Sequence, residues 1–280
     1  MKKRIITNQT INSFKDYLIE NEKATATIEK YMRDIHLFVE YATDKPLDKP
    51  LVLEYKTSLE QTYAIRSANS MLAALNSFFR FLGWHDLCVK QFKVQKETYC
   101  SEEKELSKAE YTALVRTAEQ KKNERLSLVV QTICGTGIRV SELQSITVEA
   151  VRKGEAIVSC KGKTRKIFIV SALRKKLLRY ATEQKINSGI IFVTKSGKPL
   201  DRSNIWREMK SLCEQAGVSP GKVFPHNLRH LFARTFYGIE KDIAKLADIL
   251  GHSNINTTRI YIITTGAEHQ RRMENMRLII

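Results

Sequence analysis

The chain has 280 residues, with 47 Lys and Arg against 30 Asp and Glu, a formal net charge of +17 and a pI near 9.7. This charge predicts a polyanionic partner, either nucleic acid or an anionic membrane surface. No apolar run is long enough for a transmembrane helix, no signal peptide is expected, and five scattered cysteines without a C-x-x-C pair predict neither a zinc site nor disulfides but reduced, cytoplasmic thiols.

The charge is distributed unevenly between two predicted domains. Residues 1–98 hold 15 basic and 12 acidic residues, whereas residues 99–280 hold 32 and 18. A hydrophobic content of 42% is sufficient for a core in each domain. Most of the positive charge therefore lies in the second domain.

Residues 10–98 are predicted to form a bundle of four helices. A short helix is expected before Asn21 and another between Pro50 and Gln61, with Pro46 and Pro50 separating the second helix from the third. Apolar side chains recur at steps of three and four residues in two longer segments: Ile28, Tyr31, Ile35, Phe38 and Val39, and then Ala68, Met71, Leu72, Leu75, Phe78, Phe79 and Leu82.

The periodicity is lost in a polar stretch, which places a linker at residues 99–105 and the second domain at 106–280. Ser107 and Glu110 have the spacing of a capping box and predict that a helix begins there. A further buried helix is expected from Leu126 to Ile133.

Gly135–Gly137 are expected to make a tight turn that presents Arg139, because glycine adopts backbone angles closed to other residues. Glu142 lies three residues later. Arg139 is either a phosphate-binding residue supported by Glu142 or an ordinary surface arginine paired with it.

A β-hairpin is predicted next, from strands at 156–160 and 166–170 with a basic tip at 161–165. The tip contains Lys161, Lys163 and Arg165, which form either a solvated turn or a phosphate-binding loop. A basic helix at 171–185 and a short strand at 190–193 are expected to follow, and then a helix that is capped by Ser203 and ended by Gly217.

Pro225 precedes a predicted helix on which His226 and Arg229 share a face at i and i+3. His230 is expected to point elsewhere and to be structural. A helix from 242 to 250 ends at Gly251 and presents His252, and Tyr261 follows nine residues later.

Taken singly, His252 would be a helix cap and Tyr261 a core residue. The tail 267–280 is predicted to be helical, with these apolar anchors: Met273, Met276, Leu278 and Ile279.

These residue types suit cleavage of a phosphodiester. Guanidinium groups pair with phosphate oxygens, histidines exchange protons near neutral pH, and a tyrosine hydroxyl can act as a covalent nucleophile. Two fixed cations would favour a transition state that carries more negative charge than the diester.

The motif set resembles the tyrosine recombinase (lambda integrase) family, and its Xer-type bacterial members most closely. The matching segments are T-G-I-R-V-S-E-L at 136–143, H-N-L-R-H at 226–230 and L-G-H-S-N-I-N-T-T-R-I-Y at 250–261. The resemblance implies a mainly α fold with a small β-sheet, in which an N-terminal helical core-binding domain, SAM-like, precedes an α+β catalytic domain.

The resemblance also implies the role of each residue. Tyr261 would attack the scissile phosphate, Arg139 and Arg229 would hold its non-bridging oxygens, and His226 would act as general base or hydrogen-bond partner. His252 would stabilise the transition state. In this family the hairpin lysine protonates the leaving oxygen; Lys161 matches that position, although Cys160 replaces the usual glycine and Lys163 is an alternative. The candidate DNA contacts are Arg66, Arg80, Lys163, Arg165 and the Lys2–Arg4 arm.

The predicted function is site-specific DNA recombination through a 3′-phosphotyrosyl link and a Holliday junction, with neither cofactor nor metal nor ATP. The expected assembly is a homo-tetramer on two double-stranded DNA sites, with a dimer on each site, or a mixed tetramer with a related recombinase.

The biological role remains open between the integrase or resolvase of a mobile element, a chromosome-dimer resolvase and an inversion switch. A type IB topoisomerase and a non-catalytic DNA-binding protein are the further alternatives. Because the helical pattern begins almost at once, no extra arm-binding domain is expected. The site of action would be the bacterial nucleoid in the cytoplasm.

Overall fold

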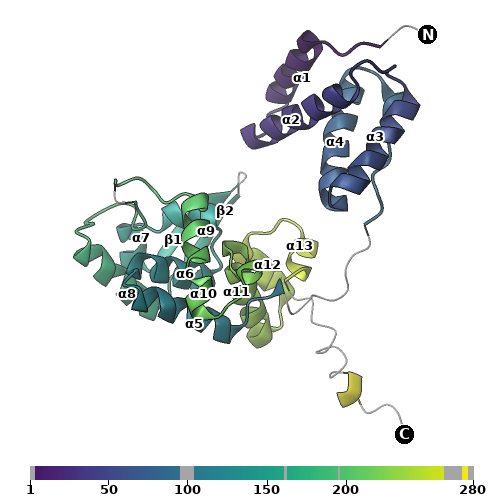
Figure 1. Cartoon of the computed structure of the whole chain (residues 1–280). Coiled ribbons are helices and arrows are strands. Elements are labelled where there is room, and N and C mark those ends of the chain that lie inside the picture. Colours follow the sequence, from purple (N-terminus) through teal and green to yellow (C-terminus); the bar gives the residue numbers. More distant parts are fainter. Residues whose placement is uncertain (1–3, 95–103, 161–162, 195, 262–272, 277–280) are drawn as a thin grey trace. The chain divides into compact units, whose positions relative to one another are not determined.

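The computed structural model describes residues 4–94, 104–160, 163–194, 196–261 and 273–276. The chain divides into two compact units, Met1–Lys96 and Glu97–Ile280 (Figure 1). Each unit has its own buried cluster of apolar side chains. The described helices are not long and apolar enough to cross a membrane.

The first unit consists of helices, as predicted. They are α1 (Asn8–Glu20), α2 (Thr25–Tyr41), α3 (Lys49–Thr62) and α4 (Ile65–Phe81), followed by the 3-10 turn η1 (His85–Leu87). The Asp48 side chain caps α3 by accepting a hydrogen bond from the Leu51 N–H at 2.9 Å. Pro50, predicted to lie between helices, is instead in the first turn of α3, where its missing N–H costs no helical hydrogen bond.

The core of the first unit is aromatic. Phe14, Phe38, Phe78 and Phe79 are fully buried, and Phe38 meets Phe79 edge to face with ring centroids 5.6 Å apart. Burial of each such side chain contributes about 1.5–3 kcal/mol to folding. These rings come from α1, α2 and α4 and therefore hold the bundle together.

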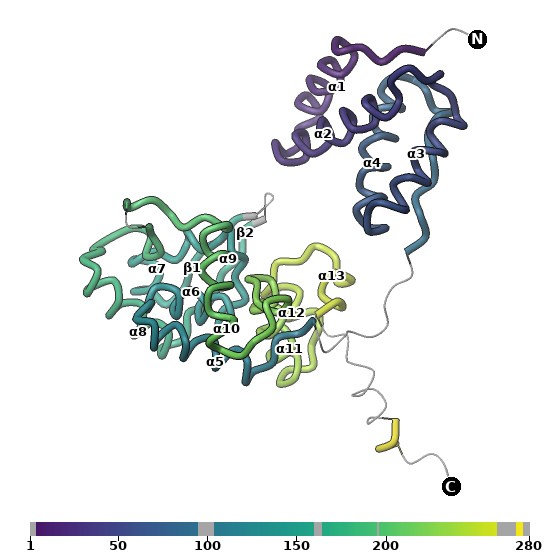
Figure 2. Tube along the Cα trace, viewed as in Figure 1, coloured from purple at the N-terminus to yellow at the C-terminus, as the bar shows by residue number. Residues whose placement is uncertain are grey.

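The second unit begins with α5 (Lys108–Gln120) and α6 (Glu124–Thr136), and the chain trace continues into the 3-10 helix η3 (Val140–Ser145) and α7 (Val148–Lys153) (Figure 2). The capping box at the start of α5 is confirmed, because Ser107 and Glu110 exchange side-chain-to-backbone hydrogen bonds at 3.1 and 2.7 Å. After the hairpin come the remaining elements: α8 (Ser171–Glu183), α9 (Arg202–Lys210), α10 (Cys213–Ala216), η4 (Pro220–Lys222), α11 (Pro225–Glu240), α12 (Ile243–Leu250) and α13 (Ile255–Arg259).

The hairpin is formed by β1 (Glu155–Cys160) and β2 (Lys163–Phe168), which pair antiparallel with Val158 opposite Arg165. The predicted tip at 161–165 is therefore too long, because β2 already begins at Lys163. Successive strand residues point to opposite faces, so Arg165 shares the core-facing side of β2 with buried Ile167, while Lys166 and Phe168 are exposed.

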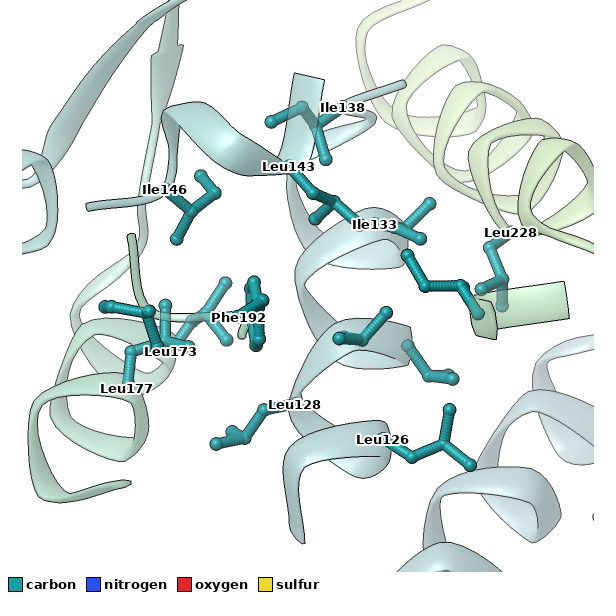
Figure 3. Packing of buried hydrophobic residues seen from close by; sticks show 14 of the residues in the cluster. Leu126, Leu128, Ile133, Ile138, Leu143, Ile146, Leu173, Leu177, Phe192 and Leu228 are labelled. Carbon is teal, nitrogen blue, oxygen red and sulfur yellow. The ribbon is translucent and has the colours of Figure 1, made fainter. Parts of the chain in front are cut away.

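Helix α6 runs through the centre of the second unit and packs against α5, α8 and α11. Figure 3 shows Leu126, Leu128 and Ile133 of α6 among apolar side chains of the surrounding elements. The other labelled side chains in that view come from η3 and its flanks, α8, the segment before α9, and α11: Ile138, Leu143, Ile146, Leu173, Leu177, Phe192 and Leu228.

Three further local predictions, all between residues 190 and 217, were wrong. The predicted strand at 190–193 forms only isolated bridges, in which Ile190 pairs with Thr147 and Val193 with Pro199. The helix predicted from Ser203 begins at Arg202 because Asp201, whose carboxylate accepts from the Asn204 N–H at 2.7 Å, is its cap. It then ends at Lys210, and α10 is a separate turn that ends at Gly217.

The predicted tail helix is described only at residues 273–276, which form one helical turn. Met273 and Met276 are exposed there, whereas Leu278 and Ile279 lie outside the described residues. A separate small cluster, made of Ala233, Leu246, Leu250 and Tyr261, joins α11, α12 and the residue Tyr261 that follows α13.

Candidate active site

A left-handed turn after α6 places Arg139. Gly137 ends the helix with φ +64°, and a Cβ added there would lie 2.5 Å from the Phe232 ring. Both its backbone angle and its surroundings therefore require glycine. The helix extends one turn further than predicted, through Thr136, whose hydroxyl accepts a hydrogen bond from the Ile138 N–H at 3.3 Å. Arg139 then occupies the position just before η3.

Arg229 of α11 is almost fully buried, with 2% of its surface exposed. Its guanidinium group donates to the carbonyl oxygens of Gly137 and, at 2.7 Å, of Leu250, which lie at the C-terminal ends of α6 and α12. The negative ends of two helix dipoles thus stabilise this cation. Burial, followed by the positive charge of Arg139, lowers the pKa of Arg229 to about 10, so the group stays protonated at neutral pH.

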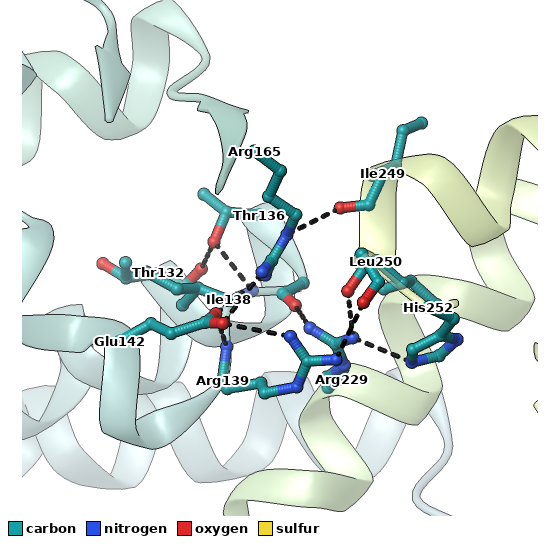
Figure 4. A network of polar contacts seen from close by, with 12 residues as sticks. Thr132, Thr136, Ile138, Arg139, Glu142, Arg165, Arg229, Ile249, Leu250 and His252 are labelled. Carbon is teal, nitrogen blue, oxygen red and sulfur yellow. Dashed lines mark hydrogen bonds and ion pairs between the residues drawn. The ribbon is translucent and has the colours of Figure 1, made fainter. Parts of the chain in front are cut away.

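Glu142 connects two further arginines (Figure 4). Its carboxylate accepts from both Nη atoms of Arg165, at 2.8 and 2.7 Å, and from the Nη1 and backbone N of Arg139, at 3.0 and 2.9 Å. Burial alone would raise the pKa of Glu142, but the hydrogen bonds from Arg165 and Arg139 outweigh it and lower the pKa to about 2. The carboxylate is therefore ionised at neutral pH.

His252 follows the left-handed Gly251 at the end of α12. Its Nε2 lies 3.1 Å from Nη2 of Arg229 and its Nδ1 lies 2.9 Å from Oγ1 of Thr258. A guanidinium group has only donors, so Nε2 must accept, and the proton of the neutral ring must be on Nδ1. Burial, with the charges of Arg229 and Arg139, lowers the pKa of His252 to about 4 and keeps the ring neutral.

Three imidazole rings surround Tyr261. The phenol ring stacks on His252 with centroids 5.4 Å apart and an interplanar angle of 14°, and it also meets His226 at 5.5 Å and His230 at 4.3 Å. Only 4% of Tyr261 is exposed. Burial, and then Arg229 and Arg139, lower the pKa of His226, which favours a neutral ring that can accept a proton.

The prediction that His230 points away from His226 was wrong. Residues at i and i+4 of a helix share a face, and the two rings lie 5.3 Å apart. The pKa of His230 is lowered to about 4 by burial and by the neighbouring His226, and its buried Nδ1 lacks a hydrogen-bond partner within the described part of the chain.

The structure brings together most of the predicted site residues. Arg139, Glu142, Arg229 and His252 form one hydrogen-bonded network, and His226 and Tyr261 adjoin it. Lys161 lies outside the described residues. For Lys163 the structure gives only the backbone pairing with Cys160.

The other candidate DNA contacts have different surroundings. Arg66 and Arg80 are both exposed on α4 of the first unit. Arg4 pairs with Asp86 at 2.8 Å, and Lys2 and Lys3 lie outside the described residues.

Arg165 is not a surface cation at a loop tip, because its side chain is only 11% exposed and is bound to Glu142. Thr258 was not predicted as a site residue. The T-T pair before Tyr261 was the available signal, but sequence alone does not show which hydroxyl faces His252.

The network combines three guanidinium groups with one carboxylate, so it keeps excess positive charge beside a buried phenol. This arrangement suits an anionic, tetrahedral group that a tyrosine oxygen attacks. A hydroxyl nucleophile, neutral imidazoles and fixed cations are the parts needed for transesterification at phosphorus.

Comparisons with known proteins agree with this chemistry. Residues 104–267 match the model of the phage integrase family, and residues 11–86 match the phage integrase N-terminal SAM-like domain. The tyrosine recombinase XerA of Pyrococcus horikoshii is 30% identical over an alignment that covers 100% of this chain and 98% of the relative. The tyrosine recombinase XerD of Listeria monocytogenes is 26% identical, with 92% and 95% covered.

Among solved structures, a lambda integrase tetramer bound to a Holliday junction is similar with a TM-score of 0.75 and 18% identity, and the match covers 93% of this chain and 78% of that one. The XerH recombinase bound to its difH substrate in a pre-cleavage complex gives a TM-score of 0.68 and 17% identity, with 96% and 84% covered. At these identities the two structures show a shared fold.

Proposed function

Because this chain belongs to the phage integrase family of tyrosine recombinases, we propose that it cuts and rejoins DNA strands at specific sites through a covalent link to Tyr261. The observation that carries the proposal is the contact between Tyr261, the Arg229-bound His252 ring and His226. It places a nucleophile, a proton acceptor and fixed positive charge in one site.

In the first step the Tyr261 oxygen bonds to the scissile phosphorus and the bond to the 5′ oxygen breaks. The phenol proton passes to a neutral imidazole, for which His226 is the proposed acceptor because its lowered pKa leaves it unprotonated at neutral pH. The departing 5′ oxygen takes a proton from a general acid, which we assign to Lys161. The products are a 3′-phosphotyrosyl link and a free 5′ hydroxyl.

In the second step the 5′ hydroxyl of a partner strand attacks the same phosphorus and releases the tyrosine. One phosphoester replaces another in each step, so the exchange needs no ATP. Arg139 and Arg229 neutralise the non-bridging oxygens, whose charge is greatest in the transition state. Since Tyr261 is buried in the described state, the reaction requires its hydroxyl to turn towards the bound phosphate.

DNA binding is proposed to involve both units. Arg66 and Arg80 are separated by nearly four whole turns of α4, so both exposed cations lie on one side of that helix. The net charge of +17 supplies the general attraction to phosphate. We propose that the reaction takes place at the bacterial nucleoid in the cytoplasm, because its substrate would be double-stranded DNA.

The proposed assembly is four protomers on two double-stranded sites, as in the lambda integrase tetramer on a Holliday junction. Insertion or excision of a mobile element and resolution of DNA dimers both use this exchange. The two roles differ in the DNA that flanks the site.

Covalent capture tests the function and identifies the target at once. The protein would be incubated with a library of nicked genomic fragments, and DNA that stays attached in denaturant would be sequenced. The wild-type protein should enrich one short, inverted-repeat sequence, and Tyr261→Phe should capture none. Capture of unrelated sequences with equal efficiency would indicate a topoisomerase-like enzyme, and no capture of any sequence would contradict the proposal.

A further inference from the structure

Arg165 binds both oxygens of the Glu142 carboxylate and also donates to the Ile249 carbonyl at the end of α12. A role in binding DNA, as predicted from the sequence, would explain neither contact. We propose that Arg165 is a positioning residue of the active site. It takes up part of the negative charge of Glu142, so that Arg139 presents more of its positive charge to the phosphate, and it fixes the end of α12 beside it. This inference rests on the proposed strand-transfer function.

The first part of the argument concerns how the carboxylate is shared. Oε1 of Glu142 accepts from Nη1 of both Arg139 and Arg165, and Oε2 accepts from Nη2 of Arg165 and the backbone N–H of Arg139. Glu142 thus fixes the Arg139 side chain and turn. Because its single negative charge is divided between two guanidinium groups, Arg139 is not fully neutralised.

Without Arg165 the whole carboxylate charge would face Arg139. Glu142 is 3% exposed as a side chain, so in the intact protein its charge is balanced by the two arginines and hardly at all by water. The remaining Arg139–Glu142 pair would be close to neutral and would attract a phosphate less strongly. Arg139, whose side chain is 29% exposed, would still be present and correctly bonded but with less effective charge.

The second part concerns α12. Nε of Arg165 donates to the Ile249 carbonyl at 3.0 Å, and Arg139 Nη2 lies 3.4 Å from the Gly251 carbonyl. A Cβ on Gly251 would lie 2.7 Å from Cδ of Arg165, so the aliphatic part of Arg165 packs directly on that residue. His252 comes next in the chain, and Arg165 therefore also helps to fix its position.

Strand β2 connects this network to the hairpin tip. Arg165 lies two residues after Lys163, where the strand begins, and pairs with Val158 of β1. A change in the hairpin on binding DNA would therefore act on Glu142 and Arg139 through the same side chain.

The chain contains a matched control for this role. Arg125 at the start of α6 is also partly buried, binds one carboxylate, Glu208, at 2.8 Å and donates to one carbonyl, Val193, at 2.9 Å. It has no part in the network around Tyr261. Arg125→Ala removes an ion pair and a carbonyl contact of the same kind, although this pair is more exposed, with 23% and 28% of the two side chains accessible, and it reports the effect of a purely structural loss.

The first experiment measures single-turnover formation of the covalent adduct at saturating protein, together with the Kd for DNA. Loss of a supporting partner of an active-site group typically costs about 10- to 100-fold, which is the decrease in rate expected for Arg165→Ala, with Kd within about twofold of wild type. Arg125→Ala should change the rate less than about twofold. Arg165→Lys keeps the positive charge but cannot bind the carboxylate in a bidentate manner, so its cleavage rate should lie between those of Arg165→Ala and Arg125→Ala.

The decisive comparison is a double variant. If Arg165 acts by sharing the carboxylate charge, Arg165→Ala with Glu142→Gln should cleave faster than Arg165→Ala alone, by about tenfold, because the charge that neutralises Arg139 is gone. In an Arg139→Ala background, Arg165→Ala should have little further effect. The inference would be overturned if the decreases in rate of the single variants multiplied in both double variants, Arg165→Ala with Glu142→Gln and Arg165→Ala with Arg139→Ala. It would also be overturned if Arg165→Ala cleaved at the same rate as Arg125→Ala.

A titration that needs no DNA separates this inference from the proposed function. Carboxyl carbon NMR should show that Arg165→Ala raises the pKa of Glu142, since burial is then opposed by fewer hydrogen bonds, and that Arg125→Ala and Arg165→Lys leave it low. An unchanged Glu142 pKa in folded Arg165→Ala overturns the inference. A wild-type protein that forms no adduct contradicts the proposed function, and the titration still decides the role of Arg165.

Discussion

Replacing Thr258 with valine changes one hydrogen bond at the centre of the network and almost nothing in volume. The Thr258 hydroxyl is fully buried and lies 2.9 Å from Nδ1 of His252. Arg229 forces Nε2 to be the acceptor, so Thr258 must accept the Nδ1 proton. Valine leaves that N–H without a partner.

The magnitude follows from the cost of a buried, unpaired donor, about 1–3 kcal/mol. If the ring shifts its proton to Nε2 to avoid this cost, two donors face each other between His252 and Arg229. To the extent that this cost raises the free energy of the transition state, it slows cleavage. An increase of about 1–3 kcal/mol in the activation free energy corresponds to a decrease of about 5- to 150-fold in rate. The free energy of unfolding should fall by a similar or smaller amount.

The assay is single-turnover adduct formation, with urea denaturation of the same samples. Thr258→Ser keeps the hydroxyl and should retain most of the rate. Thr257→Val, at the exposed neighbouring position, is the matched control and should behave as wild type. A Thr258→Val rate within about twofold of wild type, at equal stability, would refute the inferred proton position on His252.

Three further results are expected. Arg139→Ala should slow cleavage by about 10²- to 10³-fold with little change in DNA affinity, measured by single-turnover kinetics and titration binding, and equal losses in both would show that the group only positions DNA. His230 and His252 have pKa values lowered to about 4, below the 6.5 of an unfolded histidine, so the unfolded chain binds more protons between these values. The urea midpoint should therefore fall as the pH drops from 6.5 towards 4, and a constant midpoint would contradict the lowered values. Gly251→Ala should destabilise the protein by more than about 1 kcal/mol, because the residue has φ +66° and a Cβ would meet Arg165; an unchanged melting temperature would show that Arg165 moves away freely.

Much of the fold was predictable because local signals agreed with one another. The helical periodicity of residues 28–39 and 68–82, and the Ser107 capping box, give the helices found in the structure. The order of the motifs around Arg139, Arg229 and Tyr261 is sufficient to indicate the family from sequence alone.

Two of the errors concern where an element begins. Strand β2 begins at Lys163 and not at residue 166, so Arg165 lies within the strand on its core-facing side, as a buried partner of Glu142 and not as a tip residue. The cap at Asp201 was missed because Ser203, two residues away, has equal capping propensity. His230 was misplaced although its i+4 spacing from His226 was in the sequence.

The most direct test of the central claim is to identify the amino acid that becomes bonded to DNA. The protein would be trapped on its nicked target, digested with protease and nuclease, and analysed by mass spectrometry for the peptide that carries a nucleotide. The account predicts one modified peptide, with the phosphate on the Tyr261 oxygen, and none from Tyr261→Phe. A nucleotide on any other residue, or an adduct that persists in Tyr261→Phe, would contradict it.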